Sequence, residues 1–352
     1  VTSDPVSLTV VEIRKTVVGL WRFDESQGDV AVDSSGFGND GMFQQEGAGE
    51  MPTRVDGQEG FGTALSVVTS HGLGVGDGHS YVFVPGSESL KIGRLVSGVP
   101  AIGGQHHEEG EPFTVALWAH ELTDGTGDHV ATYGRFMNQK GVRQEFGGED
   151  PVWGGLQFES GAKGDSQLYT WGYGNAKFQV GTAVAPILDE WVHYAVTYDN
   201  STMKIFINGV EEFSKEFFEP QSLDFAGYTG AFEIATETAV PTGSRNFHGY
   251  LDDFALFKGA LNEEDLSKIM KGDFSDFIAP ADTPALGAAI DGSNIVLTWS
   301  SDAGGFVLET ASSLSAPNEW LSVDAEPVLE NGINQVTLPA DQQMQFFQLL
   351  KP

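Results

Sequence analysis

Residues 191–198 read Trp191-Val-His-Tyr-Ala-Val-Thr-Tyr198, in which two sets of side chains alternate along the chain. An alternation of period two is typical of a β-strand. A second strand-like run, Lys204-Ile-Phe-Ile207, follows it, and the next dipeptide, Asn208-Gly209, is typical of tight turns. This part of the chain therefore predicts antiparallel strands joined by short connections.

Similar strand-like runs recur on both sides of this stretch, between clusters of Gly, Asp and Asn. They are residues 17–23, 81–84, 113–118, 231–235 and 249–257. Helical periodicity is scarce, so the chain predicts an all-β fold, an antiparallel sandwich, rather than alternating strands and helices. Residues 262–271 are the exception. Asn262 can cap a helix there, acidic residues follow it, and lysines stand near its end.

The chain has 352 residues, a length that allows about two domains. Residues 273–285 contain two prolines among small and acidic residues, and we interpret them as a linker. We therefore expect a first β-domain over residues 17–272 and a small β-domain over residues 286–352.

Residues 1–16 form a separate extension. Val6, Leu8 and Val10 alternate with Ser7, Thr9 and Val11, which is strand-like and unusually apolar for a chain end. Two interpretations are open. The segment adds a strand to the protein's own sheet, or it pairs with a sheet edge of a neighbouring subunit, as in donor-strand assembly.

The composition restricts the partners. Acidic residues number 50 against 18 Lys and Arg, so the formal net charge is −32, and the acidity runs along the whole chain. A surface this negative repels phosphate backbones, so we expect no nucleic-acid partner and no membrane insertion. The chain has no cysteine, which excludes thiol nucleophiles, thiolate metal sites and disulfides. An even distribution of acidic residues along the chain fits a protein of a saline or calcium-rich environment.

Four segments of residues 17–272, taken in order, resemble the laminin-G-like, concanavalin-A-like jelly-roll family of secreted bacterial proteins. They are Gly19-Leu-Trp-Arg-Phe-Asp-Glu25 with residues 31–41, Phe113-Thr-Val-Ala-Leu-Trp118, Trp191–Asp199 with residues 204–209, and Gly249-Tyr-Leu-Asp-Asp-Phe-Ala-Leu-Phe257 with residues 260–266. The resemblance implies a concanavalin-A-like jelly-roll sandwich and an extracellular or cell-surface location. Residues 286–352 resemble a small fibronectin-III-like module of the kind that acts as a spacer or attachment element. The resemblance rests on Ile295-Val-Leu-Thr-Trp299, Phe306-Val-Leu-Glu-Thr310, Trp320 and Phe346-Phe-Gln-Leu349.

The family resemblance also implies a calcium site. In the family's topology the first and last core strands are neighbours, which brings Asp252 or Asp253 near Asp24. Calcium needs several oxygen ligands, and the resemblance assigns them to Asp24, Asp33, Asn39 and Asp252. Strand alternation predicts that Asp252 and Asp253 face opposite ways. In the alternative interpretation, Asp33 and Asn39 only satisfy the backbone of a turn.

Carbohydrate binding would use aromatic faces flanked by amide and carboxylate groups. The candidates are Trp153, Tyr169, Trp171 and Tyr173, and alternation places the last three on one face of a strand. In the alternative interpretation these aromatic residues pack between the sheets. We assign Trp21, Trp118 and Trp191, which lie in family-matched strands, to the core.

No signature of an enzyme is present. The chain lacks the Glu-x-Asp-x-x-Glu strand motif of laminarinase-type hydrolases, a Gly-x-Ser-x-Gly elbow and a phosphate-binding loop. We therefore expect a secreted, non-catalytic protein that uses calcium and binds a polysaccharide or cell-surface ligand, as in adhesion. One alternative is a structural subunit of an extracellular filament or sheath, which contacts neighbouring subunits through residues 1–16. A polysaccharide-degrading enzyme is the other.

Overall fold

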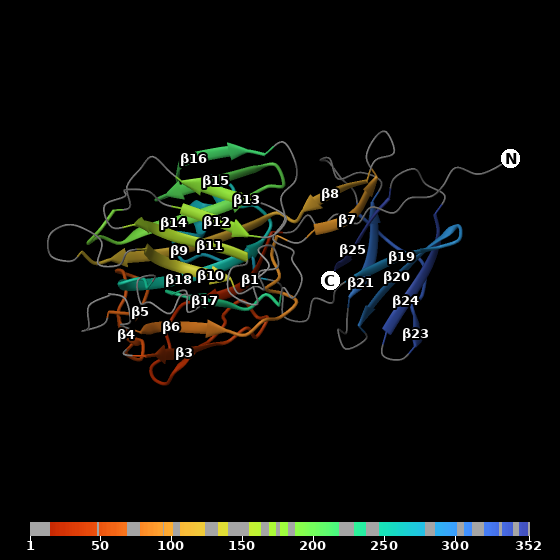
Figure 1. Cartoon of the computed structure of the whole chain (residues 1–352). Coiled ribbons are helices and arrows are strands. Elements are labelled where there is room, and N and C mark those ends of the chain that lie inside the picture. The colour runs from red at the N-terminus through yellow and green to blue at the C-terminus, as the bar shows by residue number, and fades with distance from the viewer. Residues whose placement is uncertain are drawn as a thin grey trace. The chain divides into compact units, whose positions relative to one another are not determined.

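The structure is a computed structural model. It describes residues 15–47, 49–68, 78–93, 95–100, 106–123, 133–139, 155–162, 169–173, 177–181, 187–217, 229–236, 246–278, 286–300, 306–311, 320–330, 333–340 and 345–350. Within strands 95–100, 106–110, 169–173 and 177–181, only the backbone is described. The described residues fall into two compact units, residues 15–278 and residues 286–350. Each unit consists of stacked β-sheets (Figure 1).

The first unit contains two eight-stranded antiparallel sheets, which we call sheet A and sheet B. Sheet A consists, in spatial order, of β16 (Val210–Glu216), β15 (Thr202–Ile207), β14 (Val192–Tyr198), β9 (Phe113–Glu121), β18 (Gly249–Lys258), β5 (Thr63–Ser66) and β4 (Thr53–Asp56), and β1 (Thr16–Trp21) also pairs with β18. The first and last core strands are therefore neighbours, as the resemblance implied.

Sheet B faces sheet A across the core. It consists, in spatial order, of β13 (Lys177–Gly181), β12 (Tyr169–Tyr173), β11 (Gly155–Ala162), β10 (Tyr133–Gln139), β17 (Phe232–Ile234), β6 (His79–Val84), β3 (Gly41–Glu46) and β2 (Val30–Ala31). A separate two-stranded sheet pairs β7 (Leu95–Pro100) with β8 (His106–Gly110).

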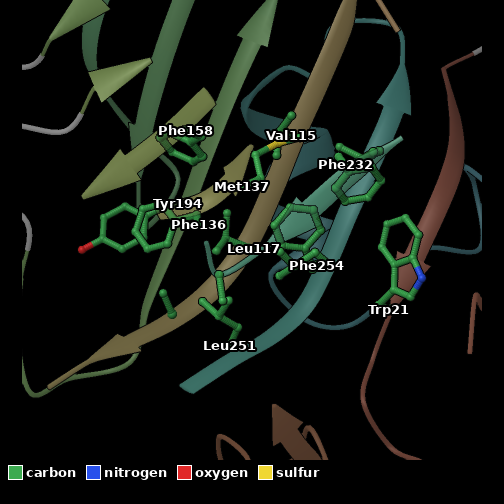
Figure 2. Packing of buried hydrophobic residues seen from close by; sticks show 14 of the residues in the cluster. Trp21, Val115, Leu117, Phe136, Met137, Phe158, Tyr194, Phe232, Leu251 and Phe254 are labelled. Atoms are coloured by element: carbon green, nitrogen blue, oxygen red, sulfur yellow. The ribbon is translucent and has the colours of Figure 1, made fainter. Parts of the chain in front are cut away.

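The main core fills the space between sheets A and B, because alternate residues of each strand point inward. Val115 and Leu117 of β9 meet Phe136, Met137 and Phe158 of sheet B in Figure 2. The ring of Phe136 stacks on that of Tyr194 with a centroid distance of 5.3 Å. Trp21 is fully buried beside Phe232 at 5.3 Å, as predicted from its place in the first core strand.

The only helix in the described part of the chain, α1 (Glu263–Ile269), covers the outer face of sheet A. Asn262 caps it, as the sequence predicts, and Asp265 completes a capping box. The following segment also packs on this face, where Phe274 and Phe277 are buried against Phe257. The predicted linker start at residue 273 is therefore wrong, because the aromatic residues of 273–278 belong to the first unit. Residues 279–285 lie outside the described residues.

The second unit contains a four-stranded sheet and a three-stranded sheet. The first consists of β19 (Gly287–Asp291), β20 (Asn294–Ser300), β24 (Ile333–Pro339) and β23 (Val328–Glu330), and the second of β22 (Leu321–Ser322), β21 (Val307–Ala311) and β25 (Phe346–Leu350). Its core is small and is built around Ile295, Leu297, Trp299, Leu308 and Val336. In the described part of the chain, no helix is long and apolar enough to cross a membrane.

Candidate functional site

Three aspartates gather where the first and last core strands of sheet A meet. Trp21 of β1 pairs with Phe254 of β18, so Asp24, just beyond β1, lies near Asp252 and Asp253. The Asp24 Oδ1 atom accepts a 2.8 Å hydrogen bond from the Thr63 backbone N–H. We call Asp24, Asp252 and Asp253 the aspartate cluster.

A β-bulge gives the two neighbouring aspartates their positions. The pairing of β18 with β9 is regular up to Asp252, opposite Trp118, and resumes at Ala255 with an irregularity between them. Asp253 adopts a positive φ of 42°, which is uncommon for a residue other than glycine. Both side chains are buried as a result, with 0% and 4% exposure. The prediction that alternation sends them to opposite faces is therefore wrong, because a bulge breaks the period of two.

The aspartate cluster is an unfavourable place for negative charge. Burial and the adjacent Asp253 carboxylate raise the pKa of Asp252 to about 8. Burial also raises the pKa of Asp253 to about 6, although the Arg22 guanidinium, 3.7 Å from its Oδ1 atom, opposes the rise. Among the described residues, no hydrogen-bond partner reaches the buried Oδ2 atom of either aspartate. Two buried carboxylate oxygens thus lack a hydrogen bond from the described residues, which is an unfavourable arrangement for a polar atom.

The loop of residues 57–62 lies directly against this cluster, and two of its glycines allow the approach. A Cβ atom on Gly57 would come within 2.7 Å of the Asp252 Oδ2 atom, and one on Gly62 within 2.1 Å of the Asp24 Oδ1 atom. The loop is closed by a 2.9 Å hydrogen bond from the Gly57 N–H to the Gly62 carbonyl. Backbone oxygens and carboxylates therefore occur together here.

Asp33 and Asn39, the other two predicted metal ligands, have different local roles. The Asp33 carboxylate accepts hydrogen bonds from the backbone of Leu20, Ser35 and Asn39 and from the Ser35 hydroxyl. The Asn39 side chain donates to the Val18 carbonyl and to Ser89, and it accepts from Ser87. Every one of these oxygens is engaged, as expected for side chains that satisfy the backbone of a turn.

The donor set of the aspartate cluster fits a hard cation such as calcium, which takes carboxylate and carbonyl oxygens. Among the described residues, no three His, Asp or Glu side chains converge into a ready-made metal site. Calcium would therefore need backbone oxygens beside Asp24, Asp252 and Asp253. The saturated carboxylate of Asp33 and amide of Asn39 do not fit this role.

A row of aromatic side chains crosses the outer face of sheet A next to the aspartate cluster. The His120 ring lies 5.5 Å from that of Trp191 and 5.5 Å from that of Tyr250, and the Trp191 and Tyr250 rings are 6.4 Å apart. All three side chains are partly exposed. We call Trp191, His120 and Tyr250 the aromatic row.

Carboxylates lie beside the aromatic row. Asp189 is exposed, and its carboxylate accepts hydrogen bonds from the Thr123 backbone N–H and hydroxyl at 3.0 and 2.9 Å, which lower its pKa. Glu190, next in the chain, is exposed as well. Burial lowers the pKa of His120, although the Asp189 charge opposes the change, so the ring is neutral at pH 7.

Trp118 and His193 form the neighbouring row of the same face. They are register partners, their rings lie 5.3 Å apart, and Phe61 of the 57–62 loop packs on Trp118 at 5.7 Å. Trp118 is buried, as predicted, but under this loop and not between the sheets. Trp191 is half-buried and belongs to no hydrophobic cluster, so its assignment to the core is wrong. The alternation of residues 191–198 could have shown this. Val192, Tyr194 and Val196 point into the main core, so Trp191 belongs to the opposite face of the strand.

The outer face of sheet B carries a polar row. Asn138 donates to Glu233 at 3.3 Å and accepts from Gln157 at 2.9 Å, and Arg135 pairs with Glu159. Glu233, Asn138 and Gln157 are only 0–2% exposed. No sequence signal identified this row, because its residues come from separate short strands.

The predicted ligand-binding residues Tyr169, Trp171 and Tyr173 lie in β12, whose backbone pairs with β11. Tyr169 pairs with Glu159, Trp171 with Gln157, and Tyr173 with Gly155. The common face of Tyr169, Trp171 and Tyr173 stays a prediction, because their side chains lie outside the described part of the structure. Trp153 lies outside the described residues.

Several solved structures are similar to parts of this chain at low sequence identity. No curated protein sequence matches the chain. Among solved structures, domain 4 of AbnA, a GH43 extracellular arabinanase from Geobacillus stearothermophilus in complex with arabinotriose, is 20% identical with a TM-score of 0.45, covering 73% of this chain and 98% of that one. Trypanosoma rangeli sialidase is 13% identical with a TM-score of 0.41, covering 71% of this chain and 32% of its own. The Ruminococcus gnavus IT-sialidase CBM40 is 12% identical with a TM-score of 0.37, covering 45% of this chain and 82% of its own.

Residues 99–267 match the laminin-G-type family model of the Concanavalin A-like lectin/glucanases superfamily. This range runs from the strands before β9 to helix α1 and includes most of sheets A and B. Residues 99–267 are therefore similar to the concanavalin A-like lectin/glucanases superfamily, and the two stacked antiparallel sheets of the first unit form a concanavalin-A-like fold.

Proposed function

We propose that this chain is an extracellular, non-catalytic glycan-binding protein, and that the aromatic row of sheet A is its binding site. The name of the matched superfamily covers lectins and glucanases, both of which act on carbohydrates. Within that class, the absence of a laminarinase-type strand motif from the sequence favours binding over hydrolysis.

The observation that carries this proposal is the partly exposed aromatic row with carboxylates beside it. Apolar C–H faces of a sugar ring pack well on aromatic rings, and its hydroxyls donate to carboxylate oxygens such as those of Asp189 and Glu190. The polar row of sheet B has suitable groups, but its described side chains are buried at 0–2% exposure. Accessibility therefore favours the aromatic row over this polar row.

We also propose that calcium binds the aspartate cluster in a structural role. A bound divalent cation would coordinate the two buried Oδ2 atoms, which have no hydrogen-bond partner among the described residues. It would link the end of β1 to the bulge of β18 beneath the 57–62 loop. Because Trp118 contacts both that loop and His193, this link would also support the face that carries the aromatic row.

A glycan array tests the proposal on the full chain with and without a chelator. We expect the wild-type chain to bind at least one polysaccharide and Trp191→Ala to lose that binding. Trp171→Ala tests the alternative face on sheet B, and Trp320→Ala, a partly buried tryptophan of the second unit, is the matched control. Loss with Trp171→Ala alone would place the site on sheet B. No binding to any glycan would contradict the proposed function.

The two alternative functions remain predictions. Residues 1–14, on which the filament alternative depends, lie outside the described residues. For the enzyme alternative, turnover assays on the polysaccharides bound in the array are decisive, and release of reducing ends would contradict the non-catalytic proposal.

A further inference from the structure

The second unit has the strand order of an immunoglobulin-type sandwich with one position open. In such sandwiches one sheet reads A-B-E-D and the other ends in C-F-G. By chain order, β19, β20, β24 and β23 take positions A, B, E and D, and β21 and β25 take positions C and F. Among the described strands, none pairs with the other edge of β25, where strand G would lie.

The open edge of β25 lacks the features that protect sheet edges. Its sequence, Phe346-Phe-Gln-Leu-Leu350, contains no charge, glycine or proline. The other described edges of this unit are shorter or protected: β22 has two residues, β23 has three with Glu330 among them, and β19 contains Gly287 and Asp291. A long apolar edge left uncovered is a site for pairing with another strand.

Among the described residues, none covers the core of the second unit on this side. Leu308 of β21 is 5% exposed, whereas its register partner Leu349 is only partly buried although it packs on the same core. Phe347 of β25 is likewise partly buried against the core. A strand beside β25 with apolar side chains on its inner face would complete this core.

The extension before the first unit has the required pattern. Val6, Leu8 and Val10 would form the apolar face, and Ser7 and Thr9 the outer face. The described chain also shows where this extension starts. The Val17 backbone N–H donates a 2.9 Å hydrogen bond to the Phe277 carbonyl, so the chain enters and leaves the first unit at neighbouring points.

This adjacency favours pairing within one molecule. Residues 1–14 and the connection to the second unit both start beside the Val17–Phe277 contact. Fourteen extended residues reach roughly 46 Å. Two segments tethered at one place meet at an effective concentration in the millimolar range, which exceeds ordinary protein concentrations.

We propose that residues 5–13 of this chain pair with β25 as the outer strand of the three-stranded sheet in the same molecule. The apolar face of Val6, Leu8 and Val10 covers Phe347 and Leu349. The extension then acts as a structural strand of the second unit.

The absence of cysteine from the chain makes crosslinking a clean test. Gln348 lies in β25 between the two core-facing residues, so its side chain is on the outer face. In the full chain, Gln348→Cys is combined in turn with Ser7→Cys, Thr9→Cys and Val11→Cys, which sample different registers. We expect at least one pair to form a disulfide within the monomer upon mild oxidation. The control replaces Gln348→Cys by Gln335→Cys, an exposed position on β24 of the other sheet, and should not crosslink.

Each other result overturns the proposal. Disulfide-linked dimers would show pairing between molecules, and no crosslink in any pair, or equal crosslinking to the Gln335→Cys control, would show that the extension lies elsewhere. Hydrogen exchange gives an independent readout without cysteines. Leu8→Asp should speed exchange of the β25 amides about tenfold or more, whereas Thr9→Asp, with the same charge on the outer face, should not. Unchanged exchange with Leu8→Asp would also overturn the proposal.

Discussion

His193 lies on the outer face of sheet A with the edge of its ring against Trp118. Its side chain is 2% exposed, and no described residue contacts its Nδ1 atom through a hydrogen bond. Burial lowers the pKa of His193 to about 3, so the folded chain keeps this ring neutral throughout the physiological range. An unfolded histidine takes up its proton near pH 6.5.

The free energy of unfolding should therefore fall as the pH drops from 6.5 towards 3, because the unfolded state binds a proton that the folded state excludes. The full slope is about 1.4 kcal/mol per pH unit, which gives roughly 2 kcal/mol between pH 6.5 and pH 5. Urea unfolding of wild type and His193→Gln at pH 7 and pH 5 measures this difference. An equal loss of stability in both proteins on acidification would show that His193 is not its source.

Substitutions at two glycines of the 57–62 loop can distinguish the cost of backbone strain from the cost of a collision with the aspartate cluster. Gly60 and Gly62 have φ values of +90° and +84°, but a Cβ atom at Gly60 would meet nothing within 4 Å, whereas one at Gly62 would collide with Asp24. Gly60→Ala should cost about 1 kcal/mol of stability from the positive φ alone. Gly62→Ala should cost about 1–3 kcal/mol more, measured by urea unfolding. Equal costs would contradict the contact.

Calcium binding at the aspartate cluster has a direct thermal test. Adding calcium should raise the melting temperature of the wild-type chain, because a ligand that binds only the folded state stabilises it. Asp24→Asn should remove most of the rise. Asp29→Asn, which changes another exposed aspartate in the same loop between β1 and β2, should leave it intact. A melting temperature that does not change between calcium and a chelator would contradict the site.

At the scale of elements, the helix shows how local sequence and packing act together. Asn262 accepts from the Asp265 N–H, and Asp265 accepts in turn from the Asn262 N–H, each at 3.0 Å. Leu266 and Ile269 then bury the inner side of α1 against sheet A. A helix of seven residues depends on both its cap and its packing.

Asn262→Ala should therefore destabilise the chain by about 1 kcal/mol, the usual effect of losing such a cap. Ser267→Ala, at an exposed position within the helix, should change the stability by less than about 0.5 kcal/mol. Chemical unfolding of both variants gives the comparison. If the two substitutions had the same effect, the cap would contribute nothing.

The elements also show how far sequence patterns reach. Period-two alternation and turn dipeptides predicted the antiparallel sandwich, and the capping residues predicted α1. The pattern could not reveal the bulge at Asp253, because a bulge is set by cross-strand pairing. It also did not separate residues 273–278 from a linker, because Phe274 and Phe277 become core residues only through sheet A. Calcium ligation by Asp24 and Asp252 stays a prediction.

At the scale of the whole molecule, the net charge of −32 is spread over both units. The carboxylates of the aspartate cluster, those beside the aromatic row, those of the polar row of sheet B, Asp33 and Asp265 are the acidic groups to which we assign a specific role. Most of the others keep the surface negative, and salt should screen their mutual repulsion. The first unit carries the proposed binding face, and the second unit is a small β-sandwich.

The central claim is that the aromatic row binds a glycan. Titration calorimetry of the full chain with the polysaccharide selected on the array measures it most directly, using wild type, Trp191→Ala and the control Trp320→Ala. We predict that Trp191→Ala weakens binding at least about tenfold, or about 1.4 kcal/mol, while Trp320→Ala binds as tightly as wild type. Equal affinity of Trp191→Ala and wild type would contradict the claim.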